Sequence, residues 1–231
     1  MMACSGRILR STGTTLGLAA LAMAVLALGG CGSDPTVPQD QVTVTPADAA
    51  GQTGYLVWAL ARIGPEFLQD PTLGVHISKR DPGNLVFSGA ITGSCDIHFA
   101  NGVGDPTTWD QAASGHMLTA PALPLQFRPF GPAGAALALG FEIEAEIDRA
   151  GGTANVHGTG TLASGPLTTT FTLAAVEVAL AGYPAGGTLT TVIAGHTAVV
   201  TFTGGNTASG LVDGLTFTVN LATGEVTEPV R

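Results

Sequence analysis

The sequence predicts a mainly β protein: an antiparallel sandwich, a barrel or a wrapped sheet, with one N-terminal α-helix packed on it. Three observations lead to this prediction. Apolar and polar residues alternate with a period of two over many short segments from residue 73 onward. Turn sequences rich in glycine, proline, asparagine and aspartate separate these segments. No helical period lies between them, so neighbouring strands are expected to pair antiparallel.

One helix is predicted ahead of the strands. Thr45 supplies a hydroxyl N-cap, a proline takes the first helical position, and Asp48 places an acid in the first turn. Apolar residues then recur at helical spacing until a Gly-Pro pair begins at Gly64. Gly51 and Gly54 are each expected to weaken this helix by roughly 1 kcal/mol relative to alanine. Its polar face lacks lysine, which favours packing on the sheet over lying in a membrane surface.

The expected strands follow in chain order. They are residues 73–80, 85–91, 95–99, 123–128, 141–148, 154–162, 167–178, 188–193, 197–203 and 215–221. Residues 101–115 are expected to form a long loop that exposes Trp109. The clearest alternation lies in 141–148, where Phe141, Ile143, Ala145 and Ile147 face a core and Glu142, Glu144, Glu146 and Asp148 face water. We interpret these carboxylates as protection of an exposed strand edge.

The sequence contains few combinations of reactive residues. The five histidines are His76, His98, His116, His157 and His196, and none lies at a metal-binding spacing along the chain. Asp96 and His98 share one face of a strand, with Cys95 beside them, and are the nearest approach to a ligand cluster. The interpretation we favour is that they are ordinary polar residues, so no metal site and no cofactor is predicted.

No catalytic motif appears either. The chain has no G-x-S-x-G elbow, S-x-x-K pair, phosphate-binding loop or dinucleotide fingerprint. The acidic row does not identify the paired acids of a glycosidase, because one acid would need a raised pKa in a cleft. We therefore expect a protein without enzymatic activity, with an envelope hydrolase as the weakest of the functional classes considered.

The first 33 residues carry a targeting signal. Arg7 and Arg10 precede an apolar run over residues 16–28, which is shorter than the roughly 20 residues that a spanning helix needs. The run ends in Leu28-Gly29-Gly30-Cys31. This stretch resembles the lipobox of bacterial lipoproteins. The resemblance implies that the chain is cut just before Cys31, after its thiol has received a diacylglycerol, and that the new amino terminus is then acylated.

The resemblance also implies a location. Gly32, rather than an aspartate, follows Cys31, which resembles the default sorting to the outer membrane in bacteria with two membranes. Stable attachment to a membrane needs about two acyl chains. The diacylglycerol on Cys31 would supply them. Cys4 would leave with the signal, and Cys95 would remain as a single thiol, expected to be buried and inert.

Charge limits the partners. Removal of the signal would leave 6 basic residues against 17 acidic ones, a net charge of −11, with Lys79 the one lysine. Nucleic acid is excluded as a partner, because phosphate binding needs clustered lysine and arginine. Attraction to an anionic membrane surface through a basic patch is excluded for the same reason.

The expected organisation is a signal peptide over residues 1–30, a lipidated cysteine and flexible tether over 31–44, and a single mostly β domain over 45–231 with its helix at 45–64. Two functions follow. The domain is either an interaction or structural module with a solid core, which binds a protein partner, or a carrier of a lipid or other apolar ligand in a β cavity. We favour the interaction module, because a packed β core is the commoner outcome.

Overall fold

The computed structural model describes residues 43–63, 75–77, 83, 85–108, 111–127, 136–179 and 183–231. Residues Thr43–Arg231 form one compact unit. The proposed signal, Cys31 and the tether up to residue 42 lie outside the described residues, as do Lys79 and Trp109.

Helix α1 (Pro46–Ile63) begins with the predicted cap. The Thr45 hydroxyl accepts a hydrogen bond from the Asp48 backbone N–H at 3.2 Å, and the Asp48 carboxylate accepts one from the Thr45 N–H at 2.8 Å. This reciprocal pair satisfies two backbone donors that the first helical turn leaves without partners. The hydrogen bond from the Thr45 hydroxyl is the main reason why the pKa of Asp48 is lowered.

The strands form a single sheet in which every pairing is antiparallel. They are β1 (Val75–Ile77), β2 (Leu85–Gly89), β3 (Ile91–Ala100), β4 (Ser114–Leu118), β5 (Leu125–Phe127), β6 (Leu137–Asp148), β7 (Thr153–Ser164), β8 (Leu167–Ala179), β9 (Pro184–Ile193), β10 (His196–Thr201), β11 (Thr207–Val212) and β12 (Leu215–Asn220). From β6 to β12 each strand pairs with the next along the chain, because short turns join them.

Strands β4 and β5 share one position in the sheet, between β3 and β6. Leu118 lies opposite Glu142 and Leu125 lies opposite Leu139, so seven steps on one side match three on the other. The four extra residues form a bulging connection. Thr119 fixes its start, because the Thr119 N–H donates to the Phe141 carbonyl at 2.9 Å and the Thr119 hydroxyl accepts from the Phe141 N–H at 2.8 Å.

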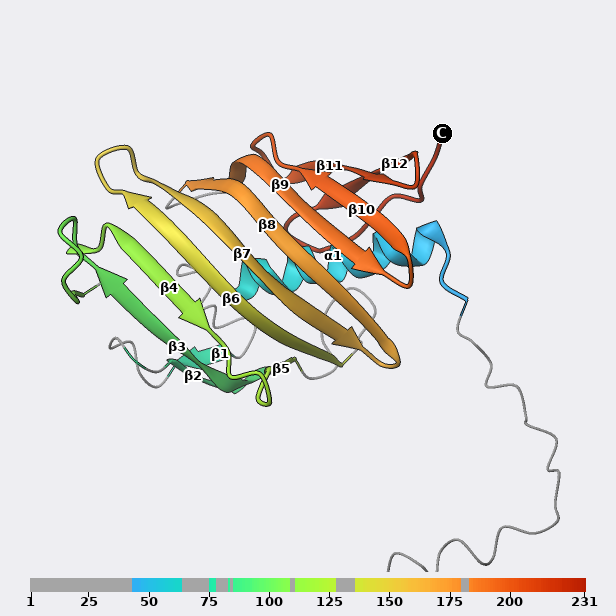
Figure 1. The fold of residues 1–231 in the computed structure, drawn as a ribbon. Helices are drawn as coiled ribbons and strands as arrows, with labels where there is room; N and C mark the ends of the chain where they lie inside the picture. Colours follow the sequence, from blue (N-terminus) through green and yellow to red (C-terminus); the bar gives the residue numbers. More distant parts are fainter. Residues whose placement is uncertain are drawn as a thin grey trace, which may run out of the picture. The chain divides into compact units, whose positions relative to one another are not determined.

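Helix α1 lies across the strands on the inner face of the sheet (Figure 1). The Thr53 hydroxyl meets the Thr191 hydroxyl of β9 at 2.7 Å, and the Trp58 ring lies 5.8 Å from the Phe127 ring of β5. Gly54 packs against Gly224 and Val226 of the C-terminal segment, which covers another side of the helix. Because the helix is enclosed in this way, its apolar residues belong to the same core cluster as the inner faces of the strands.

The predicted fold class is confirmed: the protein is mainly β, with one helix of the described part packed against an antiparallel sheet. Of the three forms left open, the antiparallel sheet matches a sandwich or a wrapped sheet. Strands β4 and β11 were missed by the sequence reading. The expected strand over residues 85–91 ends at Gly89 instead, whose φ of +107° turns the chain into β3.

The interpretation of the acidic row as edge protection is wrong. Strand β6 is not an edge, because β4 and β5 pair with one side of it and β7 with the other. The alternation itself is as predicted: the four carboxylate residues of β6 are exposed, while Phe141 and Ile147 are buried. These carboxylates therefore lie on the outer face of the sheet rather than along its margin.

Candidate functional site: a histidine and carboxylate groove

A row of polar side chains crosses four neighbouring strands on the outer face of the sheet. His98 of β3 lies opposite His116 of β4, His116 lies opposite Glu144 of β6, and Glu144 lies opposite His157 of β7. Directly opposed residues of antiparallel strands have Cα atoms about 4.5–5.5 Å apart. Four residues that are far apart in sequence thus become consecutive neighbours. We call this set the histidine row.

The strand alternation turns the histidine row outward. On β3, Cys95 and Ile97 are buried while His98 is exposed. On β6, Glu144 is exposed between residues of the inner face. Successive side chains of a strand point to opposite faces of the sheet. Burial of the inner residues therefore places the histidine row on the face that contacts solvent.

The histidine row lines an open groove of about 530 Å³. Gly104 and Pro106 of the connection between β3 and β4 form part of its lining, together with Glu146. That connection is well ordered by its own hydrogen bonds. The Asn101 side-chain oxygen accepts from the backbone N–H groups of Val103 and Asp105, both at 3.0 Å. The groove therefore has a sheet as its floor and a hydrogen-bonded loop at its side.

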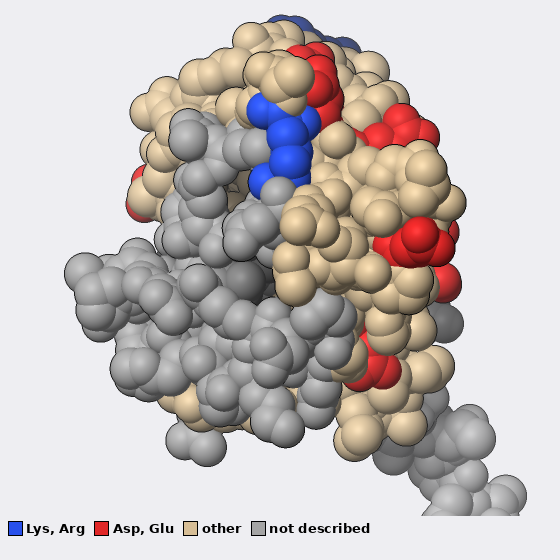
Figure 2. Space-filling model, turned by 90° about the vertical axis from the view of Figure 1, so that its left-hand side faces the viewer, with Lys and Arg blue, Asp and Glu red and all other residues tan. Residues whose placement is uncertain are grey.

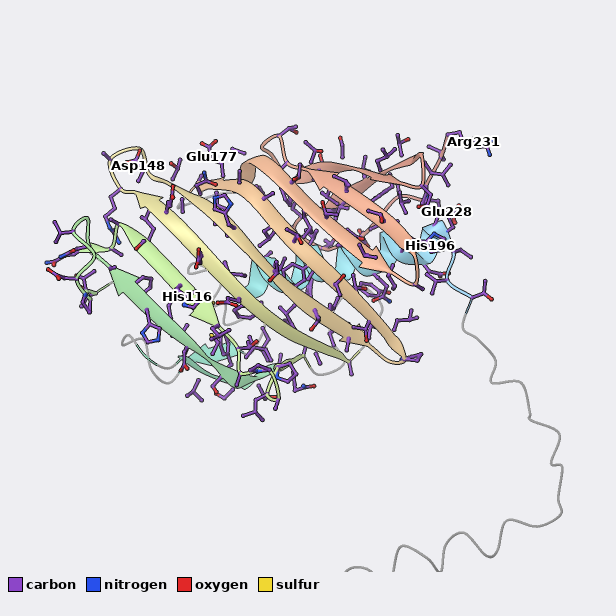
Figure 3. The ribbon with its side chains drawn as sticks, in the orientation of Figure 1. His116, Asp148, Glu177, His196, Glu228 and Arg231 are labelled. Carbon is purple, nitrogen blue, oxygen red and sulfur yellow. The ribbon has the colours of Figure 1, made fainter. Side chains whose placement is uncertain are left out.

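Two of the imidazoles, those of His116 and His157, make hydrogen bonds. His116 Nε2 lies 3.1 Å from a carboxylate oxygen of Glu142, its diagonal neighbour on β6. His157 Nδ1 accepts a hydrogen bond from the Ala175 backbone N–H at 3.3 Å. A neutral imidazole has one acceptor nitrogen, so Nε2 of His157 carries the proton. Figure 3 shows His116 on β4, within the half of the sheet that lies away from His196.

The structure separates Asp96 and His98, the two candidate ligands from the sequence, from Cys95. Asp96 and His98 do share the exposed face of β3. Cys95 lies on the opposite face with 2% of its surface exposed, so it cannot join them. Burial, and secondly the charge of Asp96, raises the pKa of the Cys95 thiol to about 12. The partner of His98 is His116, which sequence spacing could not identify because β4 was not predicted.

Among the described residues, no group of three or more histidine, cysteine, aspartate and glutamate side chains could hold a metal ion. The groove nevertheless collects imidazole nitrogens and carboxylate oxygens on adjacent strands. In the view from the side where β3 and β4 lie, acidic residues are scattered over the coloured surface and basic ones are few (Figure 2). The surroundings of the groove therefore favour a cation over an anion.

A second, shallower hollow of about 380 Å³ lies on the same outer face, over β7, β8 and β9. Threonines supply most of its lining: Thr159, Thr161, Thr170, Thr172 and Thr190. This surface offers hydroxyl and methyl groups but no charge. It carries no nucleophile paired with a base, and we assign it no chemistry.

No known protein family matches the chain, and neither a characterised protein nor a solved structure was found to match it. Within the described ranges, no helix combines the length and apolarity needed to cross a bilayer.

Proposed function

We propose that this chain is a lipid-anchored protein of the bacterial cell envelope whose β domain is a non-enzymatic interaction or structural module. The sequence Leu28-Gly29-Gly30-Cys31 behind a short apolar run supports the anchor. Lipidation of Cys31 attaches the chain to the membrane, and Gly32 favours the outer membrane where the bacterium has two. The partner is a protein that meets the outer face of the sheet.

The observation that carries the choice of a module over a carrier is the filling of the inner face by α1. A carrier needs an apolar cavity of roughly 300 Å³ or more. Leu56 and Ala59 of the helix and Phe127 of β5 are almost completely buried where such a cavity would lie. The groove and the threonine-lined hollow both lie on the outer face. The geometry thus favours recognition on the outside of the sheet.

The anchor is tested by feeding bacteria that express the full chain with an alkyne-tagged fatty acid. The wild-type protein should incorporate the tag and sediment with membranes, whereas Cys31→Ser should do neither. Cys95→Ser is the matched control and should behave as wild type, because Cys95 is buried in the core. Absence of the tag from the wild-type protein, or its presence on Cys31→Ser, contradicts the anchor.

The module is tested by site-specific photo-crosslinking in intact cells. Val103, on the loop beside the groove, and Leu211, on β11, are both exposed and accept a photoreactive residue without disturbing the core. The proposal predicts a discrete protein adduct from position 103 and none from position 211. Equal adducts from the two positions, or none from either, contradict recognition at the groove.

A further inference from the structure

The floor of the groove carries two carboxylates that no described residue neutralises. Glu144 and Glu146 alternate along β6, so both lie on the outer face of the sheet, where they are exposed and line the groove. Neither makes a hydrogen bond or an ion pair with another residue of the described part. Glu142 on the same strand differs, because its carboxylate lies 3.1 Å from His116 Nε2. The groove therefore presents two adjacent negative charges to solvent.

The surroundings of these carboxylates supply no balancing cation. No lysine or arginine is among the described residues that line the groove. Arg149 follows β6 but lies outside this lining, and its Nε donates to the Ala112 carbonyl at 3.1 Å. The full sequence carries 17 acidic residues against 8 basic ones. A negative groove in a negative protein attracts cationic groups and repels anionic ones, so its occupant should bring positive charge.

We propose that the groove receives an arginine side chain of the protein partner, with the guanidinium held between the carboxylates of Glu144 and Glu146. This inference rests on the proposed function, in which a protein meets the outer face of the sheet. Alternate residues of a strand lie about 7 Å apart. The guanidinium is a planar fork with five N–H donors and no acceptor, so it can donate to both carboxylates at once. A lysine ammonium is a compact point charge that lacks this fork.

The side of the groove suits the rest of an arginine side chain. Gly104 and Pro106 line the groove beside the sheet, and Pro106 pairs with Ala100 of β3 through an isolated bridge. These residues offer apolar surface, against which the methylene groups of arginine can pack while the charged head reaches the carboxylates. The groove volume of about 530 Å³ lies within the range of ligand sites. The hydrogen bond between His116 and Glu142 is kept.

The contact is tested by fluorescence anisotropy of the full chain, purified in a non-ionic detergent, with a dye-labelled Gly-Arg-Gly-Arg-Gly peptide as the probe. Replacement of both carboxylates, by Glu144→Gln with Glu146→Gln, should raise the dissociation constant about fivefold or more, because two ion pairs are lost while the side-chain shape is kept. A dye-labelled Gly-Lys-Gly-Lys-Gly peptide should bind the wild-type chain about threefold more weakly or worse, because its ammonium groups cannot form the fork.

The matched control is Glu177→Gln with Glu228→Gln. Both side chains are exposed and lie outside the groove, and Glu228 lies in the half of the sheet away from His116 (Figure 3). The two double variants lose the same charge, so general attraction between an acidic chain and a basic peptide falls equally in both. The control should stay within about twofold of wild type. Circular dichroism should show that both double variants keep the fold. Equal losses in the two double variants, or equal affinity for the two peptides, overturn the assignment.

Photo-crosslinking in cells separates this inference from the proposed function. With the photoreactive residue at position 103, Glu144→Gln with Glu146→Gln should reduce the protein adduct about fivefold, whereas the control pair should leave it unchanged. An undiminished adduct overturns the arginine contact while the module stands. A wild-type chain that gives no adduct contradicts the module, and the peptide titration then decides alone whether the groove takes a guanidinium.

Discussion

His196 donates a hydrogen bond from Nδ1 to the carboxylate of Asp213 while its Nε2 contacts the Val44 carbonyl at 2.8 Å. Both partners are acceptors, so both ring nitrogens must carry protons, and the imidazolium is the form that fits. His196 begins β10, Asp213 lies in the turn after β11, and Val44 precedes α1. The charged His196 ring, at the start of β10, therefore hydrogen-bonds both to the segment before α1 and to the turn after β11. These contacts lie where the chain enters the domain.

The contact between His196 and Asp213 predicts a pH-dependent stability. The hydrogen bond that His196 donates to Asp213, then the one to the Val44 carbonyl, and lastly the charges of Asp213 and Asp48 raise the pKa of His196 above its ordinary value. Its contribution is fully present below the unfolded-state pKa, about 6.5, and is lost as pH rises through the higher folded-state pKa. Urea unfolding of wild type and His196→Gln should therefore differ most below about pH 6.5 and converge as pH rises through the folded-state pKa. A difference that grows with pH would contradict this role.

Gly54 and Gly51 should respond in opposite directions to alanine. A Cβ on Gly54 would collide with the Gly224 carbonyl and the Val226 side chain, whereas one on Gly51 would meet nothing. Gly51→Ala should stabilise the protein by about 0.5–1 kcal/mol through helix propensity. Gly54→Ala should destabilise it by about 1–3 kcal/mol, because overpacking outweighs that gain. Thermal unfolding followed by circular dichroism measures both, and stabilisation by Gly54→Ala would contradict the close packing.

The buried hydroxyl pair between α1 and β9 should show strong coupling. The Thr53 hydroxyl donates to the Ala49 carbonyl at 2.8 Å, so it serves as the acceptor for the Thr191 hydroxyl. Thr53→Val leaves the Thr191 hydroxyl buried without a partner and should cost about 1–3 kcal/mol. The double variant with Thr191→Val should recover part of that loss. Additive effects in a double-mutant cycle would show that the hydroxyls do not interact.

Cys95 should be protected from alkylation in the folded protein. Because burial raises its pKa from 9.0 to about 12, the thiolate fraction at neutral pH falls by roughly a thousandfold. In a Cys4→Ser, Cys31→Ser background, iodoacetamide should label Cys95 in urea and leave it unmodified in buffer. Labelling at the unfolded rate under native conditions would place Cys95 at the surface instead.

Much of the fold could be predicted from local patterns. The Thr45 and Asp48 cap appears in the sequence as a hydroxyl and an acid three residues apart, and the structure contains both hydrogen bonds. The alternation along β6 could be read directly because its apolar and acidic residues differ so strongly. Strand β11 was missed since its Thr-Ala-Ser-Gly residues pair well yet carry little hydrophobic contrast.

The candidate site could not be predicted, because it depends on register. His98 and His116 are neighbours only through the pairing of β3 with β4, and β4 lies directly after a loop with no alternation to mark where it ends. The packing around Gly54 could not be predicted either. Helix propensity predicts only that this glycine weakens α1, whereas the structure shows that a Cβ there would collide with Gly224 and Val226. Cross-strand neighbours and close approaches are properties of the assembled sheet, so single-sequence patterns do not encode them locally.

The lipid anchor and the filled core are tested together by the native mass of the protein extracted from bacterial membranes in mild detergent. We expect the mass of residues 31–231 plus the lipid on Cys31, with no further mass that organic solvent removes. An unprocessed, unlipidated chain would contradict the anchor. A solvent-extractable apolar ligand retained by the β domain would contradict the filled core and make the protein a carrier.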